Sequence, residues 1–250
     1  MWEKTYHLLA WLLSVNNRAL NFVATSRIAR RLSFSGREWT VKSGNELKPG
    51  PNNWSDSVDN VWVDDSGQLH LRITNRNGRW YSAEVAMLQL LGYGRYAFYL
   101  SSRVDLLDKN VVAGLFVYED DSNEIDIEFS SWSGLKTNSQ YVVQPAPYTD
   151  KNLHRFNTQL KGNYSTHRFV WANASISFRS LHGHYLEPPN NHLVIAQWQY
   201  EGSHIPQPDA RTIINLWLNR GSPPSDGHEA ELVVTKFEFD AENKDSTQAQ

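Results

Sequence analysis

The residues best suited to chemistry lie in one short stretch, residues 123–130, which reads N-E-I-D-I-E-F-S. Alternate side chains of a β-strand point to the same side. A strand here would therefore place three carboxylates opposite three apolar side chains: Glu124, Asp126 and Glu128 against Ile125, Ile127 and Phe129. Like charges held this close raise the pKa of at least one member of the row.

The spacing of this row fits the cleavage of a glycosidic bond. At ~3.3 Å per residue, the Cα atoms of Glu124 and Glu128 would lie about 13 Å apart. Both side chains can lean inward on a twisted, concave strand, and carboxyls about 5–5.5 Å apart suit a retaining double displacement. Asp126 between them can hydrogen-bond to the nucleophile and tune the pair.

Two other interpretations of the acidic row stay open on the pattern alone. The first is a solvated strand face. The second is a calcium site that combines Glu119, Asp120 and Asp121 with the strand acids. An EF-hand is excluded, because its D-x-D-x-D-G loop is missing.

The segments that must position this row also have the pattern of strands. Period-two alternation of apolar and polar residues, typical of half-buried strands, occurs at 68–73, 95–104, 166–171, 175–181, 212–218 and 231–239. Clusters of Gly, Pro, Asn and Asp separate these runs, and residues 33–240 show no long helical period. We therefore expect an all-β, antiparallel sandwich or barrel.

Composition narrows the function further. The 250-residue chain has a net charge of -3, which argues against nucleic acid as the main partner, since phosphate binding needs a basic surface. It has no cysteine, so disulfides, Cys-ligated zinc and cysteine nucleophiles are excluded. The 10 tryptophans indicate either sugar stacking or an aromatic core.

The E-I-D-I-E-F run at 124–129 resembles the catalytic strand of glycoside hydrolase family 16, the lichenase, laminarinase and xyloglucan transglycosylase group. Further landmarks of that family follow in order over roughly 38–240: S-A-E-V with G-Y-G-R-Y at 82–96, T-H-R-F-V-W with S-I-S-F at 166–178, and I-N-L-W at 214–217. The resemblance implies a jelly-roll, concanavalin-like sandwich of two curved antiparallel sheets, with the sugar chain in the concave cleft.

By this resemblance, Glu124 is the nucleophile, Asp126 the assisting acid and Glu128 the general acid/base. The implied activity is a retaining endo-glycosidase on a β-glucan with β-1,3-1,4 or β-1,3 linkages. The uninterrupted E-I-D-I-E form shifts the preference toward β-1,3-1,4- or β-1,4-linked glucans. A transglycosylase with the same site and an inactive carbohydrate-binding sandwich are the alternatives. No cofactor or metal is expected in the reaction. The family is known to carry a structural calcium, but no sequence signature here fixes its ligands.

Several residues are candidates for sugar binding by their place in the family's motifs. Where lichenases read C-A-E-Y-R, this chain reads S-A-E-V-A at 82–86, so Glu84 is kept and the sugar-contacting Arg is lost. Of the lichenase Gln-x-Asn pair, Gln140 is kept and Val142 replaces the Asn, while Gln144 has the same parity and could compensate.

Aromatic and amide side chains supply the remaining candidates. Asn215 and Trp217 share one strand face, where amides can meet hydroxyls and an indole can stack on a pyranose ring. Trp132 joins the face of Glu128 if that strand continues. Asn52 would lie at the cleft rim, and Trp80, with its neighbours 79 and 81, could cover for the missing Arg near Glu84.

The ends of the chain differ from its body. We expect an N-terminal extension over 1–32, in which a signal or anchor segment stays open, one catalytic domain over 33–240 and a disordered tail over 241–250. The apolar run at 8–15 is far shorter than the ~20 residues of a membrane span. A polymeric substrate indicates an extracellular or cell-envelope location, and we expect a monomer.

Overall fold

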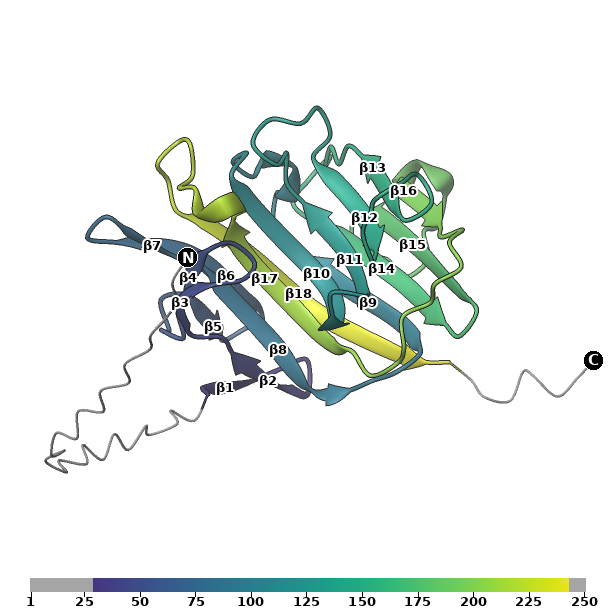
Figure 1. The fold of residues 1–250 in the computed structure, drawn as a ribbon, viewed down its shortest axis with the longest axis horizontal. Coiled ribbons are helices and arrows are strands. Elements are labelled where there is room, and N and C mark those ends of the chain that lie inside the picture. The colour runs from purple at the N-terminus through teal and green to yellow at the C-terminus, as the bar shows by residue number, and fades with distance from the viewer. Residues whose placement is uncertain (1–28, 243–250) are drawn as a thin grey trace, which may run out of the picture.

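The computed structural model describes residues 29–242 as two large antiparallel sheets packed face to face (Figure 1). The expectations for residues 1–28 and 243–250 lie outside the described residues. Strand β1 begins at Arg31 and β18 ends at Ala241, so the sandwich extends slightly beyond the expected domain of 33–240. The predicted fold class, a jelly-roll sandwich, is confirmed.

The first sheet carries the acidic row. In spatial order its strands are β1 (Arg31–Phe34), β2 (Arg37–Val41), β8 (Ala83–Leu90), β17 (Arg211–Leu218), β10 (Val111–Asp120), β11 (Asn123–Phe129), β12 (Ser139–Val143) and β13 (Leu153–Phe156).

The second sheet covers the inner face of the first. In spatial order its strands are β16 (Val194–Gln199), β15 (Ser175–His182), β14 (Ser165–Ala172), β9 (Gly94–Leu100), β18 (Ala230–Ala241), β6 (Leu69–Arg76) and β5 (Val61–Val63), with β7 (Arg79–Tyr81) paired to β6. A separate hairpin joins β3 (Gly44–Leu47) to β4 (Asn52–Trp54). Three short 3₁₀ turns complete the described chain: η1 (Val104–Leu106), η2 (Asn191–Leu193) and η3 (Asn219–Gly221).

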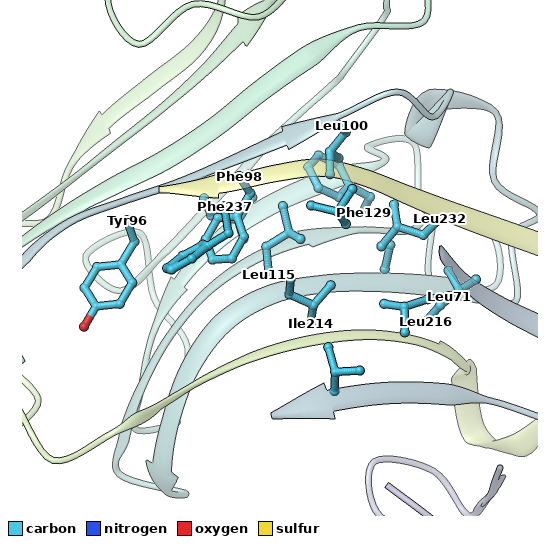
Figure 2. Close-up of a cluster of buried hydrophobic side chains, with 14 of the residues drawn as sticks. Leu71, Tyr96, Phe98, Leu100, Leu115, Phe129, Ile214, Leu216, Leu232 and Phe237 are labelled. Atoms are coloured by element: carbon cyan, nitrogen blue, oxygen red, sulfur yellow. The ribbon is translucent and has the colours of Figure 1, made fainter. Parts of the chain in front are cut away.

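The core forms where the apolar faces of the two sheets meet. Figure 2 shows Leu115, Ile214 and Leu216 of the first sheet opposite Phe98 and Phe237 of the second. Period-two alternation drives this arrangement, because burying every second side chain of a strand leaves the others on the outer face. In the first sheet the outer face is the one that carries the carboxylates.

One predicted strand is too long. The expected strand over 95–104 ends at Leu100, and the 3₁₀ turn η1 begins at Val104. Ser102 explains the ending, since its Oγ accepts a hydrogen bond from the N–H of Val233 at 2.7 Å and replaces the backbone ladder there.

Strand register aligns the outer face of the first sheet into rows that cross the strands. One row runs through directly paired residues of six neighbouring strands: Glu84, Asn215, Gly114, Glu128, Gln140 and Arg155. The next row contains Ala86, Ile213, Phe116, Asp126, Val142 and Leu153. Residues far apart in the sequence are thereby brought beside the acidic strand.

The β3–β4 hairpin is fastened to the end of β17 by Asn52, which is buried. Its Nδ2 donates to the carbonyl of Leu218 at 2.9 Å, and its Oδ1 accepts from the N–H of Leu218 at 3.1 Å. Ser82 Oγ also donates to Asn52 Oδ1, at 2.8 Å. These contacts fix the hairpin beside the outer face. Between residues 29 and 242, no helix is long and apolar enough to cross a membrane.

Candidate active site

Strand β11 presents its three carboxylates to a cleft on the outer face of the first sheet. Ile125 and Ile127 are fully buried in the core, so the acids between them must point the other way. Glu124, Asp126 and Glu128 all line one cavity of about 400 Å³. Because Asp126 is only 5% exposed, the interpretation of this row as a solvated strand face is wrong.

Burial controls the protonation of Glu124 and Asp126. It raises the pKa of Glu124 to about 7, while a hydrogen bond from Asp126 acts in the opposite direction and the charge of Glu128 adds to the rise. The pKa of Asp126 is raised well above its ordinary value, by burial first and then by the charges of Glu124 and Glu128. The hydrogen bond between the two side chains favours the carboxylate form of Glu124 and the protonated form of Asp126. The tuning role of Asp126 stays a prediction, and this contact is compatible with it.

Glu128 has different neighbours. Burial raises its pKa, whereas a hydrogen bond from Gln140 and the charge of Arg155 lower it. Gln140 Nε2 donates to Glu128 Oε2 at 2.6 Å from the directly paired position on β12. The two glutamates of the row are thus held by separate groups, Asp126 on one side and Gln140 on the other.

The cleft continues from Glu128 across β10 and β17 to Glu84. Gly114 lies between Glu128 and Asn215 in the register, and a Cβ there would come within 2.5 Å of Asn215 Oδ1. Asn215 Nδ2 donates to Glu84 Oε2 at 3.2 Å, while its Oδ1 is buried without a hydrogen-bond partner. A buried amide oxygen of this kind is costly unless a ligand hydroxyl or water meets it.

Apolar side chains form part of the cleft lining. Trp217 is half-buried and lines the same cavity as Glu124. Its role as a stacking platform for a sugar ring stays a prediction. Phe116 and Ile213 lie in the row of Asp126 and also line the cavity. This apolar lining removes water from the carboxylates and accounts for their raised pKa values.

Two predicted sugar-binding residues lie at the far side of the acidic row. Gln144 comes directly after β12, and its N–H donates to the carbonyl of Glu124 at 3.1 Å, while its side chain hydrogen-bonds to Tyr148 Oη at 2.8 Å. Trp132 does not extend β11, which ends at Phe129, and its φ of 40° places it in a turn. The condition under which Trp132 would share the face of Glu128 is therefore not met. Trp132 instead packs under the guanidinium of Arg155, whose Cζ lies 5.6 Å from the ring centre.

Asn52 and Trp80 are not among the residues that line the cleft cavity. Asn52 is instead buried and holds the β3–β4 hairpin to the end of β17 through its hydrogen bonds with Leu218. Trp80 lies on β7 and packs partly buried against the core. The expectation that residues 79–81 replace the missing Arg near Glu84 is wrong, because the cation that meets Glu84 is Lys42, with Nζ 2.9 Å from Oε1.

Several cleft residues were not predicted from the sequence: Lys42, Lys48, Pro49, Phe116, Tyr118 and Ile213. Phe116 and Tyr118 belong to a nearly continuous apolar run that does not reveal which face is outward. Lys42 lies about 80 residues from the acidic strand, and only the pairing of β2 with β8 places it beside Glu84. No signal in a single sequence could have found it.

The acidic turn before β11 holds its own backbone. Asp120 Oδ1 accepts hydrogen bonds from the N–H groups of Ser122 and Asn123, at 2.8 and 3.0 Å. Over residues 29–242, no group of three or more histidine, aspartate or glutamate side chains is arranged to hold a metal ion. Asp120 thus caps the turn that leads into β11.

Known proteins resemble this chain in fold. No protein-family model matches the sequence. No curated protein matches it either. Solved structures do match in fold, with probability 1.00 for each of the three described here. A Bacillus licheniformis β-glucanase has a TM-score of 0.59 at 18% identity, covering 82% of this chain and 92% of that one.

The second is described as an immunostimulatory antigen and pseudo β-1,3-glucanase of Mycobacterium tuberculosis, with a TM-score of 0.61 at 18% identity over 82% of this chain and 91% of that one. The third, a glycosyl hydrolase family 16 protein from Mycobacterium smegmatis, has a TM-score of 0.58 at 15% identity, covering 79% and 89%. At these identities the likeness shows the fold. The chain has the sandwich fold of β-glucanases, as the sequence resemblance predicted.

Proposed function

We propose that this protein is a retaining endo-glycosidase that hydrolyses internal bonds of a β-glucan. The observation that carries the proposal is the row of three carboxylates on β11, which line one cleft around the buried Asp126 and are held by different partners. Burial of this kind separates the protonation of neighbouring acids, which acid/base catalysis requires. The β-glucanases that share the fold support the choice of substrate.

The proposed reaction uses the two glutamates in turn. Protonated Glu128 donates its proton to the leaving glycosidic oxygen while the carboxylate of Glu124 attacks the anomeric carbon, so the C–O bond to the leaving sugar breaks and a glycosyl ester forms. Glu128, now a carboxylate, then takes a proton from water, which attacks the same carbon and frees Glu124. Two inversions give net retention.

Asp126 positions the nucleophile in this scheme. Its carboxyl donates a hydrogen bond to Glu124, which favours the ionised form of Glu124 that attacks. The apolar lining of the cleft excludes water from the ester until the leaving sugar departs. Because a polymeric glucan is met outside the cytoplasm or in the envelope, an extracellular or cell-envelope location is part of the proposal.

The test is the release of reducing ends from barley mixed-linkage glucan, laminarin, xyloglucan and agarose by the parent and by Glu124→Gln and Glu128→Gln. Activity on a β-glucan that both substitutions abolish is the expected result. New chain lengths without new reducing ends would indicate transfer to a sugar instead of to water.

An inactive carbohydrate-binding sandwich is the second candidate, since one structural neighbour is described as a pseudo β-1,3-glucanase. It predicts glucan binding without turnover in the parent, and binding that Glu124→Gln leaves unchanged. Turnover of any polymer in the panel would exclude it.

A further inference from the structure

Two hollows on the outer face of the first sheet share one wall. The cleft that contains the carboxylates has a volume of about 400 Å³. A second hollow of about 440 Å³ lies over β2 and β8, between Thr40, Ser43 and Ala86. Lys42 and Glu84 line both hollows. The side chains of this pair therefore stand between the two spaces.

Four contacts hold the wall in place. Lys42 Nζ lies 2.9 Å from Glu84 Oε1 and donates to the carbonyl of Lys48 at 2.8 Å. The same ammonium lies 4.2 Å from the centre of the Trp54 ring. On the other side, Asn215 donates to Glu84 Oε2. Any other position of the Lys42 side chain would lose three of these contacts.

The pair is largely withdrawn from water, since the side chains of Lys42 and Glu84 are only 25% and 9% exposed. Burial raises the pKa of Glu84, and the charge of Lys42 opposes that rise. Separating such a pair leaves a buried charge uncompensated, which is strongly unfavourable. A bound sugar chain is neutral and cannot replace either charge. The wall therefore stays closed when a ligand enters.

The position of the wall defines one end of the cleft. Glu84 lies in the same row as Glu128, three strands away, which is about 14 Å at the usual strand spacing. A sugar chain that lies along this row from Glu128 meets the Lys42–Glu84 pair at that distance. The second hollow begins directly behind it.

We propose that the Lys42–Glu84 pair ends the sugar-binding cleft on the β8 side and so sets how long a glucan segment the protein recognises there. The inference rests on the proposed function, because it takes the ligand to be a β-glucan chain. Behind the wall, the second hollow offers a place for further sugar units that the parent protein does not use.

The experiment measures binding separately from turnover. In a Glu124→Gln background, the dissociation constants of mixed-linkage β-glucan oligosaccharides of increasing length are measured by calorimetry. Two double variants are compared, Lys42→Ala with Glu84→Gln and Lys42→Met with Glu84→Gln. Both remove the same charges, and the amide oxygen introduced at position 84 can still accept a hydrogen bond from Asn215. They differ only in the volume at position 42, because Met keeps a long side chain beside Trp54.

For the parent background and the Met variant, affinity should rise with oligosaccharide length and then level off at the same length. For the Ala variant it should keep rising beyond that length, by at least about threefold in the dissociation constant for the longer oligosaccharides. Thermal unfolding confirms that all the proteins compared are folded.

Two results would overturn the inference. One is an Ala variant that levels off at the parent's length. The other is a Met variant that shifts the limit as far as the Ala variant does, since charge and not volume would then be responsible. A folded parent background that binds no oligosaccharide of any length would instead refute the proposed function, and with it the sugar site that the wall closes.

Discussion

Replacing the proposed nucleophile should stabilise the fold at neutral pH and leave it unchanged in acid. Glu124 has a folded pKa of about 7, above its ordinary value of 4.5. A carboxyl whose pKa is raised by folding holds its proton more tightly in the folded state. The fold therefore loses stability as the pH rises from 4.5 to 7, because the unfolded chain releases that proton first.

The magnitude follows from the two pKa values. Each tenfold change in a proton-binding constant is worth about 1.4 kcal/mol, so ionisable Glu124 costs the folded state about 3 kcal/mol at pH 7 and almost nothing at pH 4. Glutamine carries no such cost. Its amide oxygen can also accept the hydrogen bond that Asp126 donates, so the substitution keeps the local contact.

Urea unfolding of the parent and of Glu124→Gln, at pH 4 and at pH 7, measures this difference. The free energy of unfolding of the variant should exceed that of the parent by about 3 kcal/mol at pH 7 and match it at pH 4. The control is Glu119→Gln, at an exposed carboxylate near the end of β10, and it should give no comparable gain at either pH.

A gain of the same size at both pH values would refute this reasoning, since the effect would not depend on ionisation. Equal stability of parent and variant at pH 7 would also refute it. It would mean that Glu124 is ionised in the folded protein without cost, and that the cleft does not withdraw it from water.

Three further substitutions test His167, Gln140 and Asn52. Burial lowers the pKa of His167 to about 3 in the folded protein, so its contribution to the free energy of unfolding is complete above pH 6.5 and is lost as the pH falls below that value. His167→Gln should reduce this loss by about 1.4 kcal/mol per pH unit, as measured by urea unfolding at pH 4–6. Gln140→Ala removes a hydrogen bond that lowers the pKa of Glu128, so the alkaline limb of kcat/KM should move to higher pH. Asn52→Ala leaves the buried N–H and carbonyl of Leu218 without their side-chain partner and should cost roughly 3 kcal/mol in the free energy of unfolding.

Each of these predictions has an outcome that contradicts it. A His167→Gln variant with the parent's full acid slope would show that another group governs acid unfolding. Movement of the alkaline limb to lower pH in Gln140→Ala would reverse the electrostatic role given to Gln140. An Asn52→Ala variant as stable as the parent would mean that the hairpin does not depend on Leu218.

The sequence predicts most of the fold because its strands alternate clearly. Leu69, Leu71 and Ile73 are buried as expected, and so are Ile125 and Ile127 on the core side of the acidic strand. Alternation fixes which face each strand buries, and the acidic row follows from it directly. Trp132 shows the limit of this pattern, because alternate residues share one face only as long as the strand continues.

Register between distant strands is what the sequence does not contain. The contact between Lys42 and Glu84 depends on the pairing of β2 with β8. The contact between Asn215 and Glu84 depends on the pairing of β17 with β8. Asn52 was expected at the rim because its neighbours are typical of a turn. Its buried role needs the carbonyl and N–H of Leu218, which lie 166 residues away.

In the proposed reaction, Glu124 and Glu128 cleave a β-glucan by double displacement. Proton NMR of the first product released from mixed-linkage glucan tests it most directly, because it reports the anomeric configuration before mutarotation. We expect the β-anomer to appear first with the parent and no product to form with Glu124→Gln. An α-anomer appearing first, or turnover that survives the loss of Glu124, would contradict it.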